Sequence, residues 1–121
     1  MKKLAALLAL LASSSTAATG IASDNFNTVV VEVRVAIGNP SVGVIQIGAD
    51  AVNRPSCATY STGNNFFGRW FAVDLSTDGG REAVKAALAA QLAGKRVRVT
   101  GTGTCTVNTN KENLSAIYVQ N

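Results

Sequence analysis

The chain contains no histidine, and it has only two cysteines and seven acidic residues among its 121 positions. Zinc is held by cysteine, histidine and carboxylate ligands, so this metal has too few of its preferred ligands here. Nucleophilic catalysis needs a base beside the nucleophile, and neither a histidine nor a Ser-x-x-Lys motif supplies one. The acidic residues form no recognisable pair of the kind that hydrolyses glycosidic bonds. These absences predict a protein that is not an enzyme and that needs no metal or cofactor.

The sequence also lacks an apolar run long enough to cross a bilayer, which takes about 20 residues. Residues 4–12 are apolar, follow Lys2 and Lys3, and precede a stretch of small residues. This order is typical of a secretory signal peptide. We therefore predict a leader over residues 1–18, with Ala22 as the latest candidate for its last residue, and a single domain over residues 19–121. A buried N-terminal helix is the alternative, and the lack of a cysteine near the cleavage site disfavours a lipid anchor.

Charge and cysteine content agree with an exported protein that is secreted or periplasmic. The formal charge of +4 becomes +2 once Lys2 and Lys3 leave with the leader. So small an excess does not favour nucleic acid as a partner. In an oxidising compartment Cys57 and Cys105 are expected to form one disulfide that closes a long loop. Two free thiols, or half of a metal site, are the alternatives.

The stretch 66–107 reads as strand, helix and strand, and the rest of the chain is organised around it. A strand beginning at Phe66 leads into the turn 74–80, which is rich in residues that cap helices. Asp74 and Asp78 flank the start of the predicted helix, where capping explains them better than acid–base chemistry does. Residues 81–93 are strong helix formers, Gly94 suits a left-handed C-terminal position, and residues 95–105 alternate as a strand does.

Further strands are predicted at residues 28–37, 42–47, 57–60 and 114–120, with a bulge near Gly43. The predicted fold is therefore mainly β with one helix. It is a small, closed or partly open Greek-key barrel of the OB type, with five to six antiparallel strands and the helix inserted before the last two. A β-sandwich is the alternative, although it would not need a helix at that place.

At 100° per residue, one side of the predicted helix is expected to face the barrel. That side is made by Val84, Ala87, Leu88, Gln91 and Leu92. The opposite side is mostly alanine, where a solvated helix normally carries lysine and glutamate. We predict that it contacts a neighbouring subunit through Ala86, Ala89, Ala90 and Ala93. The alternative is an exposed, alanine-rich helix without a partner.

An early hairpin, the mid-chain Cys57, the helix DLSTDGGREAVKAALAAQLAGK and a strand leading to Cys105 together resemble the B subunits of AB5 toxins. The branch that looks most similar is that of subtilase cytotoxin and the pertussis-like typhoid toxin. The resemblance covers about residues 26–119 and implies a binding module without catalysis. In that family five OB-fold subunits form a ring with the helices at its centre, and the outer surface binds sialylated or related glycans. The resemblance thus implies a homopentamer, a glycan ligand and a toxin A subunit as partner.

The family places a sugar-binding serine just after an aromatic residue at the start of the first strand. Asn27 stands at that place here, after Phe26, so the resemblance assigns the contact to Asn27 or to the hydroxyl of Thr28. The alternative is that Asn27 only caps the entrance of the strand.

Aromatic and basic residues elsewhere can also hold an anionic sugar, because arginine pairs with carboxylates and aromatic rings stack on sugar faces. The candidates for such contacts are Tyr60, Arg69, Trp70 and Tyr118, with Arg96 and Arg98 on one further strand face. Each aromatic residue has a core position as its alternative. The leading hypothesis is thus a glycan-binding subunit, and the competing one is a periplasmic inhibitor or protein-interaction module.

Overall fold

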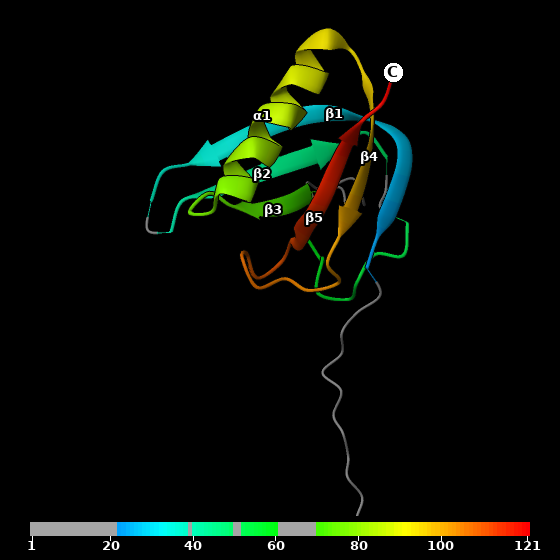
Figure 1. The fold of residues 1–121 in the computed structure, drawn as a ribbon. Coiled ribbons are helices and arrows are strands. Elements are labelled where there is room, and N and C mark those ends of the chain that lie inside the picture. The colour runs from blue at the N-terminus through cyan, green and yellow to red at the C-terminus, as the bar shows by residue number, and fades with distance from the viewer. Residues whose placement is uncertain (1–21, 39, 50–51, 61–69) are drawn as a thin grey trace, which may run out of the picture.

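The computed structural model describes residues 22–38, 40–49, 52–60 and 70–121 of the chain. Its elements, in order, are β1 (Asp24–Ala36), β2 (Val42–Ile47), β3 (Trp70–Asp74), α1 (Asp78–Ala93), β4 (Arg96–Gly101) and β5 (Glu112–Val119), as labelled in Figure 1. The protein is thus mainly β with one helix before the last two strands, as the sequence predicts.

The five strands form one sheet that closes on itself in the order β1-β2-β3-β5-β4, with β4 pairing back onto β1. All neighbours are antiparallel except β3 and β5, which run parallel from Phe71 opposite Glu112. The prediction of antiparallel strands alone is therefore wrong at this pair. Parallel neighbours need a long crossover, and here α1 and β4 lie between the two strands in the chain.

The long strand β1 bends, so that its first part pairs with β4 and its second part with β2. Its register shifts between Asn25 and Thr28 and again between Val30 and Glu32. Such irregularities raise the local twist and let a sheet curve. The bulge expected near Gly43 is not found there, because Gly43 pairs in regular register with Val35 and Val73. The bend that closes the ring lies in β1 instead.

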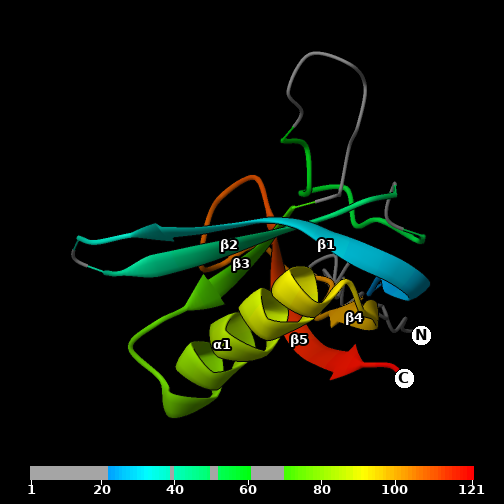
Figure 2. The same ribbon diagram turned by 90° about the horizontal axis from the view of Figure 1, so that it is seen from above.

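The core is built from strand valines, isoleucines and a phenylalanine, and α1 packs against it. Figure 2 shows α1 lying alongside the sheet. The buried hydrophobic cluster consists of Val30, Ile45, Ile47, Phe71, Val73, Ala87, Ala90, Val97 and Val99. A Cβ on Gly43 would lie 2.9 Å from a methyl carbon of Val84, so the missing side chain lets the helix approach β2 closely.

The face that the helix buries matches the predicted one only in part: Val84 and Ala87 pack on the core as predicted, but Leu88 and Leu92 do not. Ala87 and Ala90 are 0% and 1% exposed, whereas Leu88 and Leu92 are 45% and 80% exposed. Leucine at 88 and 92 had indicated a core contact because of its hydrophobicity, but close packing on the sheet selects small side chains. Ala90 is therefore covered by its own chain. Its predicted place on the outer face with Ala86, Ala89 and Ala93 is wrong.

Capping follows the sequence at both ends of α1. The helix begins three residues earlier than expected, and the hydroxyl of Thr77 accepts a hydrogen bond from the backbone N–H of Gly80 at 2.9 Å. Gly94 adopts the left-handed conformation with φ 65°, and its backbone N–H bonds to carbonyls of the last turn. Substituting such an N-cap by alanine typically costs about 1 kcal/mol.

Two further predictions concern the loops. Cys57 and Cys105 form a disulfide with their Cα atoms 6.1 Å apart, as predicted. Residues 57–60 form no strand, so the short third strand predicted there is wrong. The strand predicted from residue 66 is described only from Trp70, where β3 begins. The strand after the helix ends at Gly101 rather than at residue 105.

Candidate functional site

An ion pair joins the first residue of β1 to the centre of β4. Arg98 donates from Nε to Oδ1 of Asp24 at 3.0 Å and from Nη2 to Oδ2 at 2.8 Å. The hydrogen bonding from Arg98 is the main cause of the lowered pKa of Asp24; burial opposes it, and the Coulomb attraction of Arg98 adds a still smaller lowering. A bidentate pair of this kind holds the guanidinium in a defined plane.

Two exposed aromatic rings lie against that guanidinium. The Cζ atom of Arg98 is 4.2 Å from the ring centroid of Phe26 and 5.2 Å from that of Tyr118. Phe26 is 61% exposed and Tyr118 is 51% exposed. Both distances fall within the range of cation–π contacts, which reaches about 6 Å. We call Asp24, Phe26, Arg98 and Tyr118 the arginine cluster.

The strand register explains why these residues meet. Arg98 and Tyr118 are direct cross-strand partners in the antiparallel pair of β4 and β5. Phe26 lies on β1 at the register shift between Asn25 and Thr28, and Asn27 there has a positive φ of 54°. The irregularity leaves Phe26 and Asn27 exposed while Asn25 and Thr28 are buried. The bend of β1 therefore presents the Phe26 ring beside Arg98.

Of the two residues that the resemblance selects, solvent reaches Asn27, and Thr28 is only 6% exposed. The carbonyl oxygen of Asn27 accepts a hydrogen bond from Nη1 of Arg96 at 3.0 Å. Arg96 is exposed at the start of β4, two residues before Arg98. Asn27 thus lies at the border of the arginine cluster, with a second guanidinium beside it.

Two other predicted sugar contacts, Tyr60 and Trp70, lie together with Lys111 in a second cluster, which we call the lysine cluster. The Tyr60 and Trp70 rings meet edge to face at 4.9 Å, and Nζ of Lys111 lies 3.8 Å from the Tyr60 centroid. Trp70 is 2% exposed and Lys111 is 9% exposed. Burial, and to a lesser degree the positive charge of Arg34, lowers the pKa of Lys111. Trp70 is therefore a core residue, and Arg69 lies outside the described residues.

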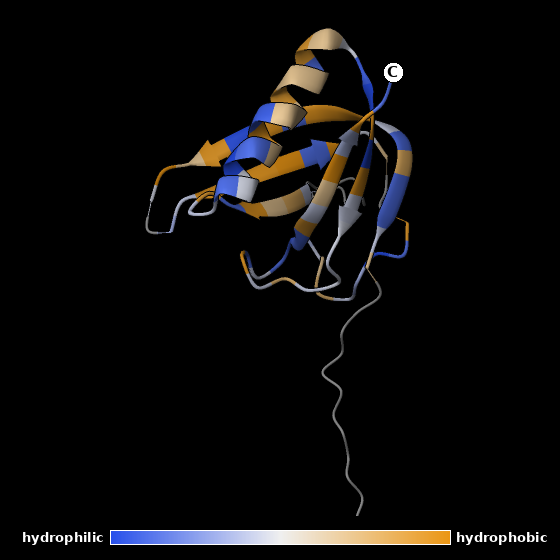
Figure 3. Ribbon diagram, viewed as in Figure 1, coloured by the Kyte–Doolittle hydropathy of each residue, from blue (hydrophilic) through white to orange (hydrophobic). Residues whose placement is uncertain are grey.

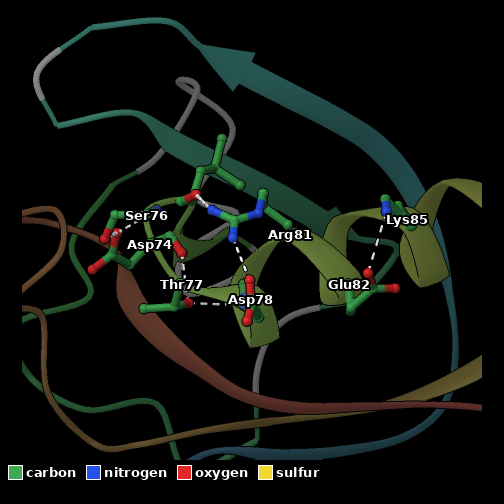
Figure 4. Close-up of polar contacts among 9 residues, drawn as sticks. Asp74, Ser76, Thr77, Asp78, Arg81, Glu82 and Lys85 are labelled. Carbon is green, nitrogen blue, oxygen red and sulfur yellow. Dashed lines mark hydrogen bonds and ion pairs between the residues drawn. The ribbon is translucent and has the colours of Figure 1, made fainter.

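The acidic residues near the helix start make local polar contacts (Figure 4), but the residue that caps the helix is Thr77 and not Asp74 or Asp78. Asp74 accepts hydrogen bonds from the hydroxyl of Ser76 at 2.6 Å and from its backbone N–H at 2.9 Å, and these bonds lower the pKa of Asp74. Asp78 forms an ion pair with Arg81 one turn along α1. Within the described ranges, no group of three metal-ligating side chains is close enough to hold an ion.

Comparison with known proteins returned nothing: no family model, no curated protein and no solved structure matches this chain. A membrane-crossing helix is not found in the part of the chain that the structure describes.

Sequence reasoning considered Arg98 and Tyr118 separately and did not join them to Phe26 or Asp24. The signal that existed was alternation along each strand, which places Arg98 between Val97 and Val99 and Tyr118 between Ile117 and Val119. The register that aligns the two strands, and the bend that brings Phe26 to them, depend on the closure of the sheet.

Proposed function

We propose that the protein is a secreted or periplasmic, non-catalytic binding subunit of the OB type, which recognises glycans and assembles from copies of itself. The observation that carries this proposal is the arginine cluster, in which two exposed aromatic rings flank a guanidinium fixed by Asp24. The resemblance to AB5 toxin B subunits supports it, because the stretch that the family uses for sugar contacts is 25–28 here.

The chemistry of the cluster suits a sugar with an acidic group. Aromatic faces stack on the apolar face of a pyranose ring, and a guanidinium pairs with a carboxylate. Asp24 occupies Nε and Nη2 of Arg98, which leaves Nη1 without a hydrogen bond among the described residues. Arg96 adds a second exposed positive charge next to Asn27. A glycan that bears a carboxylate is therefore the ligand class we propose.

Assembly is proposed through one flank of α1, with a second copy of this chain as the occupant. Leu88 and Leu92 are exposed on the helix, and Val31 and Val35 are 47% and 55% exposed on β1. The side chain of Gln91 donates to the carbonyl of Val31 at 2.8 Å, so this part of the helix lies beside β1. Figure 3 shows the hydrophobic character of the last turns of α1. We call this surface the leucine flank.

A glycan array with the mature protein tests the binding proposal, followed by titration of any ligand found. Phe26→Ala should abolish most of the signal while the protein stays folded, because Phe26 is largely exposed. Val52→Ala is the matched control, since the side chain of Val52 is 56% exposed and its truncation leaves the backbone hydrogen bonds of Val52 with Asp24 and Asn25 in place. An array without any bound glycan, or equal loss in both variants, would contradict the proposal.

Light scattering on the mature protein tests the assembly. Leu92→Arg places a charge on the leucine flank and should convert an oligomer to a monomer, with circular dichroism as the folding control. Ala89→Arg is the comparison variant, because Ala89 is exposed but lies on the other side of the helix with Ala86 and Ala93, which we call the alanine face. Dissociation by Ala89→Arg alone would favour the alanine face, and a wild-type monomer at tens of micromolar would exclude the assembly.

One observation favours the alternative of an inhibitor or protein-interaction module. Ile37, next to the turn between β1 and β2, is 94% exposed. An apolar side chain so far from the core can insert into a pocket of a partner protein. A blank array, a monomeric protein and a partner interaction lost in Ile37→Asp would together support this second function.

A further inference from the structure

A buried site next to the start of β1 joins Ser23 to Glu112 of β5. The carboxylate of Glu112 accepts a hydrogen bond from the backbone N–H of Ser23 at 3.1 Å and from the Ser23 hydroxyl at 2.5 Å. The backbone N–H of Gly103 donates to the same carboxylate at 2.8 Å. Ser23 and Glu112 are each 1% exposed.

The backbone around this carboxylate is shaped to fit it. A Cβ on Gly101 would lie 2.1 Å from both the carboxyl carbon and one oxygen of Glu112, so any side chain at 101 would displace the acid. The backbone N–H of Gly101 also donates to the carbonyl of Ser23 at 2.9 Å. Ser23 is thus held through its N–H, its hydroxyl and its carbonyl.

The donors around Glu112 are all neutral. In the described ranges no lysine or arginine forms an ion pair with Glu112, whereas Asp24, one residue from Ser23, pairs with Arg98. Removing a carboxylate from water is costly unless a positive charge or a full set of hydrogen bonds compensates for it. A cation at the position of the Ser23 nitrogen would provide the missing positive charge.

We propose that the mature protein begins at Ser23, and that its terminal ammonium group is the counter-ion of Glu112. A secretory signal peptidase would hydrolyse the Ala22–Ser23 peptide bond. Water adds its hydroxyl to the carbonyl carbon of Ala22, and a proton goes to the nitrogen of Ser23. The new amine, protonated at neutral pH, then lies at the position of the nitrogen that is 3.1 Å from Oε2 of Glu112.

Two observations select this bond among the cleavage sites that the sequence allows. Gly20 and Ala22 supply the small-x-small pattern that signal peptidases accept. Ala22 is exposed, whereas Ser23 is the first buried residue that the structure describes. The inference rests on the predicted leader and not on glycan binding. The proposed N-terminus and the proposed glycan binding can therefore each be wrong without affecting the other.

The mass of the exported protein is the first test. The full chain is expressed in a bacterial host, and the protein recovered from the periplasm or medium is measured intact. The expected mass is that of residues 23–121 with one disulfide. A protein that begins at Ala18 or Thr19 would overturn the proposal and keep the leader, and an uncleaved protein would overturn both.

The second test measures whether the terminal charge and Glu112 are coupled. Mature proteins that begin at Ser23 or at Ala22 are compared by thermal unfolding, each with Glu112 or with Glu112→Gln. We expect the Ser23 form to melt several degrees higher than the Ala22 form, and we expect Glu112→Gln to remove that difference. Glu82→Gln on the exposed face of α1 is the matched control and should leave the difference intact. An equal difference in the Glu112 and Glu112→Gln pairs would overturn the ion pair.

Discussion

The arginine cluster and the lysine cluster are made of the same kinds of residue, a cation against aromatic rings, but they differ in burial. Phe26 and Tyr118 are 61% and 51% exposed beside Arg98, whereas Trp70 and Lys111 are 2% and 9% exposed beside Tyr60. In the first cluster the cation has a carboxylate partner, and the hydrogen bond to Asp24 is the main cause of the raised pKa of Arg98. In the second cluster, burial is the main cause of the lowered pKa of Lys111.

This difference in burial indicates which groups of aromatic rings and cations can bind a ligand. A ring that already lies in the core contributes to folding and has no free face. A ring held at the surface by a paired arginine keeps a face open and loses little freedom on binding, because its neighbour is already ordered. Mutations should therefore change stability at the lysine cluster and binding at the arginine cluster.

The largest effect is expected from Trp70→Ala in the lysine cluster. Removing a buried tryptophan side chain leaves a cavity and costs about 3–5 kcal/mol of unfolding free energy. Denaturant unfolding followed by circular dichroism measures this loss. Glycan affinity per folded molecule should stay unchanged, and a selective loss of affinity in a fully stable variant would place Trp70 in the binding site instead.

Cys57→Ser should have the next largest effect, because the disulfide closes a loop with a sequence separation of 48 and ties the segment before Tyr60 to the connection between β4 and β5. Loss of such a bond costs about 2–5 kcal/mol. Unfolding with and without reductant measures the change. Thiol labelling of the denatured, unreduced wild type should give no signal at either cysteine, and labelling at both would contradict the disulfide in the native protein.

Tyr118→Ala in the arginine cluster should change stability by less than about 0.5 kcal/mol, as is usual for exposed positions. Loss of one aromatic contact, about 0.5–1.5 kcal/mol, should weaken glycan binding up to about tenfold. Isothermal titration with the glycan found on the array measures the affinity. Tyr118→Phe keeps the ring and should retain most of it, so equal losses in both variants would point to the hydroxyl rather than to stacking.

The smallest effects are shifts in the pH dependence of stability. The pKa of Asp24 is lowered in the folded protein, so its pairing stabilises the fold above the ordinary value of about 3.9 and is lost as the pH falls through the folded pKa. Asp24→Asn should reduce the acid dependence. Urea unfolding at about four pH values between pH 2 and 5 measures the free energy of unfolding of both proteins. The same acid dependence in the wild type and in Asp24→Asn would contradict the ion pair.

Lys111 should act at the other end of the pH scale. Its folded pKa lies below the ordinary value, so the folded state disfavours the charged form. Stability should therefore rise with pH between the folded pKa and the unfolded value of about 10.4. Lys111→Met should remove this rise, and a wild-type protein without it would show that the lysine is solvated rather than buried.

Patterns of residues close together in the chain predicted much of the secondary structure. The strand β2 forms at the predicted bounds 42–47, Thr77 of the predicted capping turn caps the helix, and Gly94 ends it in the left-handed conformation. The disulfide was predicted from composition and compartment, because only two cysteines exist. Each of these features depends on residues close together in the chain, or on a choice with a single possible partner.

The burial of each helix face and the contacts between distant side chains depend on the tertiary structure. Hydrophobicity along the helix favoured Leu88 and Leu92 as core residues, yet both are exposed, and close approach to the sheet buries Ala90 beside the predicted Ala87. The arginine cluster depends on the register of β4 with β5 and on the bend of β1, and the buried acid at Glu112 depends on the return of β5 beside Ser23. Such contacts join residues far apart in the chain, and their register follows from closing the whole sheet, which local periodicity does not encode.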